Sequence, residues 1–499
     1  MIGLVMDLRK KTYSALFWSL CDRGGEQVIR FVLSIVLARL LLPEHFGLIG
    51  MAYVVIELAR VFVLSGFGLA LINNQEATIT DECSVFYFNI IIGFIGTALI
   101  FASSPFIGYF YKSPELIPIL KVLSFNVVLG SFGTIQNVMM TKRIDFKAQT
   151  LVSLPATMLS GGVGIAMAYA GYGVWALVVQ TFFRTALQTI LLWFVHSWRP
   201  RLLFSLTSLK KMFGFGSKML LVSLVQMIFG NIYTIFIGKV FSPSQLGFYT
   251  RANQTQQLPL DTIWTIVGRV AFPVFSSIKN DSDKMRRALE KASGNLSFLV
   301  FPSLIISAVA APVLFKLFFG ERWLPSVPMF QILCISNLFY PLENLLNNAI
   351  LSKGNTSLNF KLQIFKYATI LCSIIFSIPF GINGMLIAYG ALSYLTFLLS
   401  AFFTEREIGY KMSSQITDLL PYLICSCFAG TAMFLVSLIN IENDILLMLC
   451  QISTGTVIYA GLSFFMKLKA LQDTIDILSP FLLKMLLRKK ISNGTNNLG

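Results

Sequence analysis

The chain has 499 residues, of which 56% are hydrophobic and only 12% are charged, and its formal net charge is +16. Soluble domains carry about a quarter of charged residues, so this composition excludes an ordinary soluble globular protein. Two histidines and seven scattered cysteines argue against a histidine-based metal site, a zinc site and a disulfide framework. We therefore expect an all-α integral membrane protein.

Long apolar segments follow one another along the chain. A helix needs about 20 apolar residues to cross a hydrocarbon core of about 30 Å, and residues 90–110 and 384–403 meet this length without a charge. We expect about 14 transmembrane helices, although the weakly hydrophobic segments 246–276 and 326–352 leave about 12 or 13 as an alternative. In chain order the predicted spans are 14–41, 47–72, 84–110, 116–140, 148–170, 174–196, 212–240, 246–276, 292–319, 326–352, 358–380, 384–404, 417–438 and 445–466.

A short pattern occurs twice, at positions offset by 200. It consists of a basic residue, then proline, glycine and alanine, and each copy lies between two apolar segments. The two copies are Arg39, Pro43, Gly47 and Ala52, and Lys239, Pro243, Gly247 and Ala252. Repeats of this kind recur in transporters, which bind their substrate between the repeated halves.

Weaker matches pair spans 1–6 with spans 7–12. Asn137 and Lys142 resemble Asn348 and Lys353 at the cytoplasmic ends of the fourth and tenth spans. Because each repeat has an even number of spans, the two six-helix lobes are related by a pseudo-twofold axis along the membrane normal. We predict an N-lobe at 1–205, a C-lobe at 206–411, two extra helices at 412–466 and a basic amphipathic cytoplasmic tail at 467–499.

Lys and Arg gather in alternate loops, for example at residues 9–11, 284–291 and 484–490. The opposite loops hold Lys112 and Arg322, with Lys239 at a rim. The positive-inside rule therefore places both termini in the cytoplasm. This distribution predicts that the basic surface meets anionic lipid head groups and that no nucleic acid is bound.

Charged residues inside spans cost roughly 2.5–3.5 kcal/mol each on insertion scales, so they usually face a bundle interior or a hydrated cavity. The first span is the richest in polar residues, and these residues share one helix face. They are Asp22, Arg23, Glu26, Gln27 and Arg30. Further polar residues in later spans are Glu57, Arg60, Arg184, Lys218, Arg251, Asp261, Arg269, Glu343, Asn344, Asn347 and Asn348. An alternative is that each charge pairs with a neighbour and only holds helices together.

Basic side chains outnumber acids among these residues, so a cavity between the lobes would suit an anion. Guanidinium groups match phosphate oxygens in geometry and charge. The candidates for anion binding are Arg23, Arg30, Arg60, Arg184, Lys218, Arg251 and Arg269.

Several stretches resemble the Wzx-like polysaccharide repeat-unit flippases, nearest the colanic-acid-type exporters. These flippases are a branch of the multidrug/oligosaccharidyl-lipid/polysaccharide exporter superfamily. The resembling stretches include VLARLLLPEHFGLIGMA (36–52), GYGVWALVVQ (171–180), SWRPRLLFSL (197–206), IGKVFSPSQLGFYTRA (237–252) and FGERWLPSVPMFQIL (319–333). One departure is Tyr233, where related sequences usually have an acid. If that acid matters for ion coupling in the relatives, coupling here uses another residue or is absent.

The resemblance implies a flippase working by alternating access in the bacterial cytoplasmic (inner) membrane. Its cargo would be an undecaprenyl-pyrophosphate-linked oligosaccharide for O-antigen, capsule or exopolysaccharide assembly. A polymerase and a chain-length regulator would be partners, and no cofactor is expected apart from H⁺ or Na⁺ coupling. The coupling candidates are Asp22, Glu26, Glu57, Asp261 and Glu343. The candidates for sugar contact are Gln27, Asn344, Asn347 and Asn348.

Three alternatives remain open at this point. Two are transporters of the same superfamily, a peptidoglycan-precursor lipid flippase and a cation-coupled drug exporter. The third is a membrane glycosyltransferase or polymerase, which would need acids on sizeable outer loops. The one Asp-x-Asp sequence, from Asp281 to Asp283, is predicted to cap a helix instead.

Overall fold

The computed structural model describes residues 24–64, 66–74, 76–143, 145–439, 441–474 and 476, without the side chains of residues 64, 265, 266, 269 and 270. In these ranges every regular element is a helix, which confirms the all-α prediction. Asp22, Arg23, the start of the first predicted span and most of the predicted tail at 467–499 lie outside the described residues.

Residues 24–40 form the first described helix. The elements that follow are α2 (Pro43–Leu64), α3 (Phe67–Asn73), α4 (Ile79–Tyr111), α5 (Leu116–Ser131), α6 (Thr134–Lys142), α7 (Phe146–Tyr169), α8 (Val174–Val195), α9 (Leu206–Gly230), α10 (Ile232–Val240), α11 (Pro243–Ser277), α12 (Ser282–Phe318), η1 (Glu321–Trp323), α13 (Ser326–Ser336), α14 (Tyr340–Ser352), α15 (Thr356–Ser377), η2 (Ile378–Phe380), α16 (Gly381–Ile408), α17 (Met412–Ser437) and α18 (Asp444–Phe465). Asp281 caps α12, since its Oδ1 accepts a hydrogen bond from the Lys284 amide at 2.9 Å, as predicted.

The described residues include 9 helices long and apolar enough to cross a membrane, or up to 10 if the bent pair α5 and α6 is one span. One of the 9 is the continuous stretch Thr356–Ile408, which contains both α15 and α16 and their η2 turn. The protein is therefore a multi-pass membrane protein, while about 14 spans stays a prediction.

Several predicted spans are broken rather than straight. The span predicted at 116–140 bends by 45° between α5 and α6, and the one at 326–352 is interrupted between α13 and α14. These two segments are the fourth and tenth spans, which the sequence repeat pairs. The span predicted at 212–240 is likewise interrupted at Asn231, between α9 and α10.

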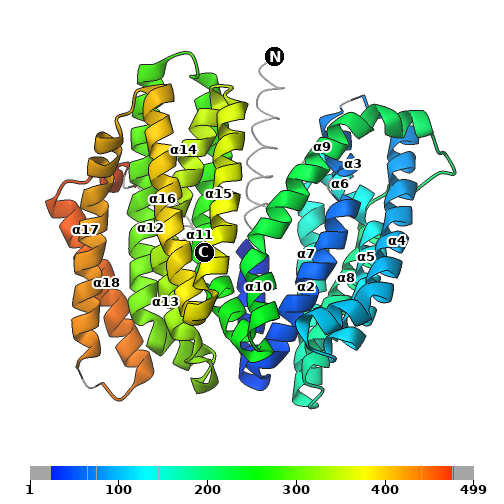
Figure 1. The fold of residues 1–499 in the computed structure, drawn as a ribbon, viewed down its shortest axis with the longest axis horizontal. Coiled ribbons are helices and arrows are strands. Elements are labelled where there is room, and N and C mark those ends of the chain that lie inside the picture. Colours follow the sequence, from blue (N-terminus) through cyan, green and yellow to red (C-terminus); the bar gives the residue numbers. More distant parts are fainter. Residues whose placement is uncertain are drawn as a thin grey trace, which may run out of the picture. The chain divides into compact units, whose positions relative to one another are not determined.

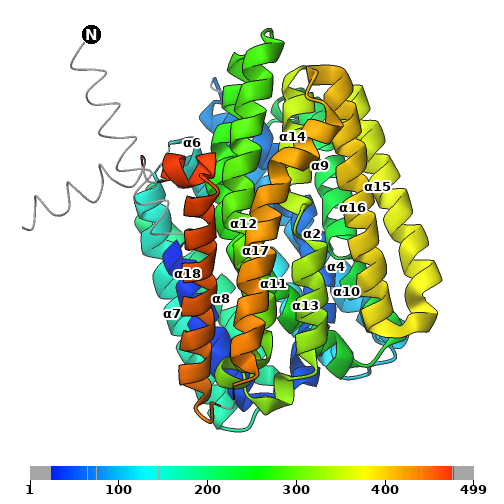
Figure 2. The same cartoon turned by 90° about the vertical axis from the view of Figure 1, so that its left-hand side faces the viewer.

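By contacts the chain forms two compact units, unit 1 (Met1–Arg251) and unit 2 (Ala252–Gly499). In unit 1, α4 packs on α5, α7 on α8, and α9 on α3 (Figure 1). In unit 2, α17 and α18 lie side by side against α12, and α16 packs with α13, α14 and α15 (Figures 1 and 2). The boundary between the N-lobe and the C-lobe, which the sequence repeat places between residues 205 and 206, stays a prediction.

The two copies of the repeated pattern meet within unit 1. A Cβ atom built on Gly47 would lie 1.8 Å from the carbonyl oxygen of Pro243, and one built on Gly247 would lie 1.9 Å from that of Pro43. Each glycine therefore allows the other copy's proline backbone to approach, which no side chain would permit. The two helix starts form a reciprocal crossing, as a duplication predicts.

The residues that begin α2 and α11 also repeat a local hydrogen bond. The amide of Leu42 donates to Nδ1 of His45 at 3.3 Å. At the equivalent positions of the second copy, the amide of Ser242 donates to Oε1 of Gln245 at 3.3 Å. Different side chains thus satisfy the same backbone donor before each helix.

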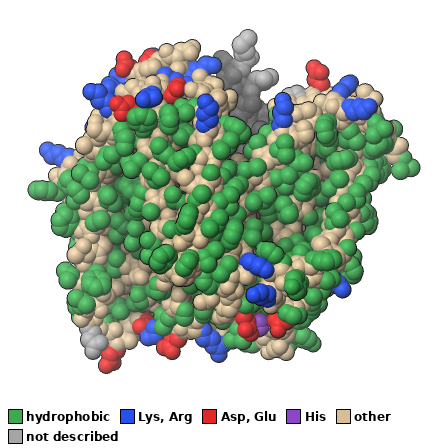
Figure 3. Space-filling model, in the orientation of Figure 1, with side chains coloured by type: hydrophobic (Ala, Val, Ile, Leu, Met, Phe, Trp, Pro, Cys, Tyr) green, Lys and Arg blue, Asp and Glu red, His purple; other side chains and the backbone are tan. Residues whose placement is uncertain are grey.

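The visible surface of each unit has hydrophobic side chains over its middle, with Lys, Arg, Asp and Glu gathered mainly towards its two ends (Figure 3). Large apolar side chains such as Leu99, Phe106 and Phe376 are exposed on the helices. Apolar exposure of this extent fits contact with lipid rather than water.

Candidate functional site

Unit 1 contains a polar cluster centred on Glu26, on the helix at 24–40. Oε1 of Glu26 accepts hydrogen bonds from Nη2 of Arg30 at 2.6 Å and from Nε of the same residue at 3.0 Å. It also accepts from Nη2 of Arg184 on α8 and from Oγ1 of Thr157 on α7, the latter at 3.4 Å. We name Glu26, Arg30, Thr157 and Arg184 the Glu26 cluster.

Thr157 also fixes the second arginine of the Glu26 cluster, because Nε of Arg184 donates to its Oγ1 at 3.3 Å. The side chains of Arg30 and Arg184 remain 53% and 31% exposed, whereas that of Glu26 is 19% exposed. The positive charges of Arg30 and Arg60 both lie close enough to repel the positive charge of Arg184. The cluster is therefore held by one acid while its guanidinium groups remain accessible.

A second pair lies on α2, one helical turn apart. Nη1 of Arg60 donates to Oε1 of Glu57, and the side chain of Tyr53 hydrogen-bonds to the same acid. Arg60 is 44% exposed, so part of its donor fork is open to solvent or ligand. The three arginines Arg30, Arg60 and Arg184 outnumber the two acids that hold them. The group therefore carries a net positive charge.

The chemistry of this arrangement suits an anion. A guanidinium carries five N–H donors, so a carboxylate that engages one or two of them leaves others for a ligand. The acids hold the planar groups in place, and parallel N–H donors suit the oxygens of a phosphate. Glu26 and Arg30 pair along the first described helix, which is the neighbour pairing that the alternative to a hydrated cavity expects.

Unit 2 contains a buried ion pair between α14 and α15. Nζ of Lys366 lies 2.9 Å from Oε1 and 3.1 Å from Oε2 of Glu343, and Oγ1 of Thr396 donates to Oε2 at 3.2 Å. The side chains of Glu343 and Lys366 are only 3% and 18% exposed. We name these two residues the Glu343 pair.

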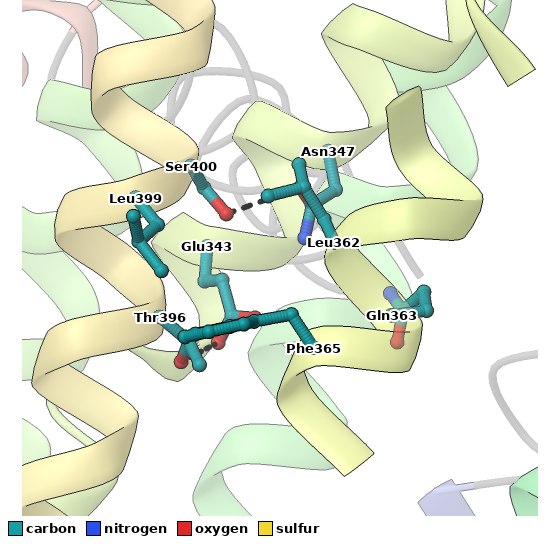
Figure 4. A pocket seen from close by; sticks show the side chains of 8 residues that line it. All are labelled: Glu343, Asn347, Leu362, Gln363, Phe365, Thr396, Leu399 and Ser400. Atoms are coloured by element: carbon teal, nitrogen blue, oxygen red, sulfur yellow. Dashed lines mark hydrogen bonds between the residues drawn. The ribbon is translucent and has the colours of Figure 1, made fainter. Parts of the chain in front are cut away.

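A small polar pocket adjoins the Glu343 pair (Figure 4). One turn after Glu343, Oδ1 of Asn347 accepts a hydrogen bond from Oγ of Ser400 at 3.2 Å. We name the pocket the Glu343 chamber; its lining residues are Glu343, Asn347, Leu362, Gln363, Phe365, Thr396, Leu399 and Ser400.

The other predicted site residues differ in burial and surroundings. Arg251 is 3% exposed and lies with its Cζ 4.6 Å from the ring centre of Phe46 in unit 1. Lys218 is exposed on α9, and Asp261 is exposed on α11. The half-buried positions are Gln27, Asn344 and Asn348, and the side chain of Arg269 is not described. The roles predicted for all these residues stay predictions.

Sequence reasoning missed the partners that complete both groups. Lys366 is one of two lysines in the apolar span predicted at 358–380, and it lies further into this span than Lys361, so its depth was a usable signal. Thr157 and Thr396 carried no such signal, because threonine is common in apolar helices. Tyr233, at the position that departs from the relatives, is buried on α10.

The chain is similar to known proteins along most of its length. It is 27% identical over 383 residues to the teichuronic acid biosynthesis protein TuaB of Bacillus subtilis (strain 168), covering 76% of this chain and 79% of that protein. It is 25% identical over 426 residues to the lipopolysaccharide biosynthesis protein WzxC of Escherichia coli (strain K12), covering 84% and 86%.

Among solved structures, the lipid II flippase MurJ in an inward closed conformation matches with a TM-score of 0.70 at 15% sequence identity. The match covers 91% of this chain and 99% of that one, and at this identity it shows a shared fold alone. A family described as “Polysaccharide biosynthesis protein” matches residues 36–328. Because that match covers more than half of the chain, the protein belongs to this family of polysaccharide biosynthesis proteins.

Proposed function

We propose that the protein is a non-enzymatic flippase for undecaprenyl-pyrophosphate-linked oligosaccharide repeat units. It moves them from the inner to the outer leaflet of the bacterial cytoplasmic membrane, for assembly of a cell-surface polysaccharide. The observation that carries this proposal is the Glu26 cluster with Arg60, a net positive group of guanidiniums inside a membrane-spanning unit of a polysaccharide biosynthesis family member.

In this mechanism the pyrophosphate binds Arg30, Arg60 and Arg184 while the polyprenyl tail stays in lipid. Each arginine is held by Glu26 or Glu57, so little ordering entropy is lost when the anion binds. The phosphate oxygens then compete with the carboxylates for N–H donors. Arg23, Lys218, Arg251 and Arg269 are further candidates for this anion.

The remaining predicted roles belong to the same proposal. Gln27, Asn344, Asn347 and Asn348 contact sugar hydroxyls, and an acid such as Glu343 couples transport to an ion. Both termini face the cytoplasm, and the exported units pass to a polymerase and a chain-length regulator. Alternating access would move the site between leaflets, as in other repeat-built transporters.

The test is a lipid analysis of cells in which the gene is deleted and then supplied as wild type, Arg30→Ala, Arg184→Ala or Arg143→Ala. We expect complete lipid-linked repeat units to accumulate at the cytoplasmic face of the deletion strain and of the first two variants. Arg143 is exposed at the end of α6, so Arg143→Ala is the matched control and should restore export.

Other lipid products would point to the alternatives. Accumulated peptidoglycan precursor would indicate a precursor flippase, and truncated repeat units would indicate a glycosyltransferase. Units displayed outside but never joined would indicate a polymerase. Normal export by Arg30→Ala and Arg184→Ala, with both proteins present in the membrane, would remove the Glu26 cluster from the mechanism.

A further inference from the structure

Glu343 is a buried acid that contacts a cation and adjoins a pocket with further oxygen atoms. It lies on α14, almost fully buried, and both of its carboxylate oxygens point at one cation, the ammonium of Lys366. An ionised carboxylate inside an apolar bundle is stable only when a positive charge and hydrogen-bond donors compensate it. Lys366 and Thr396 supply both.

The Glu343 chamber offers further oxygen atoms close to this carboxylate. Asn347, Thr396 and Ser400 contribute one amide and two hydroxyl oxygens, and Gln363 lines the same space (Figure 4). Carboxylate, amide and hydroxyl oxygens together form a ligand set typical of a hard cation. The position where such a cation would neutralise Glu343 is taken by Nζ of Lys366.

We propose that the Glu343 chamber is a monovalent-cation site whose cation is built into the chain as Lys366. The ammonium contacts both carboxylate oxygens, so Na⁺ does not bind there in the wild-type protein. This inference deepens the ion-coupling part of the proposed function, on which it rests. The exclusion of Na⁺ can be tested by a binding measurement, without any measurement of transport.

The inference predicts what happens when the built-in cation is removed. Lys366→Met keeps most of the side-chain length but deletes the ammonium, which leaves Glu343 buried without its counter-charge. Na⁺ then becomes the group that restores neutrality. A ligand that binds only the folded state raises the unfolding temperature with its concentration.

The experiment uses the full-length purified protein in detergent at pH 8, where carboxylates are ionised. Thermal unfolding is compared in NaCl and in choline chloride at equal ionic strength. We expect no Na⁺-specific change in Tm for the wild type and a rise of roughly 2–4 °C for Lys366→Met. The double variant Glu343→Gln/Lys366→Met should lose the Na⁺ response.

A matched control removes a lysine that lies against an aromatic ring. Nζ of Lys121 on α5 lies 5.2 Å from the ring centre of Phe101, so Lys121→Met deletes an ammonium without opening a carboxylate. It should show no Na⁺ response. This control separates binding at Glu343 from a general effect of Na⁺ on lysine variants.

Two outcomes would contradict the inference. A Na⁺-specific rise in wild-type Tm that Glu343→Gln abolishes would mean that Na⁺ enters beside Lys366. A folded Lys366→Met protein that ignores Na⁺ would mean that the chamber is no cation site. If Lys366→Met does not fold in either salt, Lys366→Gln replaces it, and the wild-type measurement still decides. Loss of export is not a readout here, so a wrong cargo assignment would leave these outcomes unchanged.

Discussion

The two units hold membrane charges of the same kind in opposite ways. In unit 1, Glu26 is shared between Arg30 and Arg184, and both arginines stay partly exposed. In unit 2, Glu343 has one lysine; the side chain of Glu343 is 3% exposed and that of Lys366 is 18% exposed. Excess guanidinium at an accessible site favours an incoming anion, whereas a matched buried pair satisfies itself. The two groups therefore differ in the ratio of basic to acidic side chains and in the burial of the acid.

The largest expected effect comes from removing the acid of each group. Glu343→Ala leaves Lys366 buried without its partner, and the free energy of unfolding should fall by about 3–5 kcal/mol. Glu26→Ala leaves arginines that water reaches, so the loss should be smaller, about 1–2 kcal/mol. Denaturant unfolding of both variants in the same detergent measures the difference. Equal losses would contradict the contrast between the units.

The next prediction concerns the crossing, where the two copies of the repeat make equivalent contacts. In Gly47→Ala or Gly247→Ala, the new methyl group meets the carbonyl of Pro243 or Pro43, so the crossing must open. We expect a loss of about 1–3 kcal/mol in unfolding free energy for either variant.

The control for the glycine variants is Gly162→Ala on α7, since a Cβ built there meets nothing within 4 Å. This change should be neutral or slightly stabilising, because alanine is the better helix former. A large asymmetry between Gly47→Ala and Gly247→Ala would show that the crossing is not reciprocal in energy.

A smaller effect belongs to the exposed pair on α2. A double-mutant cycle of Glu57→Gln and Arg60→Gln should give a coupling energy of about 0.2–1 kcal/mol, typical of solvent-exposed pairs. The coupling should shrink between low and high salt. A coupling of several kcal/mol that ignores salt would place this pair with the Glu343 pair instead.

The smallest effect is a pH dependence at the end of α8. Burial first, and then the charge of Arg143, hold the pKa of His196 below its usual range; Asp145 opposes this shift and Arg199 adds to it. The unfolded chain therefore binds more protons in the window below about pH 6.5, and stability falls as the pH drops through it.

The comparison variant for this pH dependence is His196→Asn. Nδ1 of His196 accepts a hydrogen bond from the amide of Trp198 at 3.0 Å, and an asparagine oxygen can replace this acceptor without titrating. Between pH 7 and pH 5 the wild-type Tm should fall slightly more than that of the variant. Identical pH profiles would remove His196 as the cause.

The sequence predicted the architecture because apolar length and charge placement determine which segments enter a membrane. It also predicted the repeated pattern of proline and glycine, but not that the two copies cross at these residues. The breaks at Asn231 and between α13 and α14 were not predicted, because a helix can bend within an apolar run without any change in hydrophobicity. Whether about 14 spans exist stays a prediction.

For the candidate site, the sequence identified the acids and arginines but not how they group. Glu26 and Arg30 are neighbours on one helix, so their contact follows from spacing alone. Arg184 and Lys366 reach their partners through tertiary packing, which helical periodicity does not encode. Arg251 illustrates the same limit, since its contact with the ring of Phe46 joins residues far apart in the sequence.

The reciprocal crossing of the two repeat copies has a consequence for biosynthesis. Unit 1 extends to Arg251 because the first turns of α11 pack against the start of α2. While the ribosome is still translating the first repeat, Pro243 has not yet been synthesised. Gly47 therefore lacks the backbone against which it packs in the complete chain. The contact between the start of α2 and the start of α11 can form only after Pro243 and Gly247 have left the ribosome. Unit 1 therefore completes its packing only once the second copy of the repeated pattern has been synthesised.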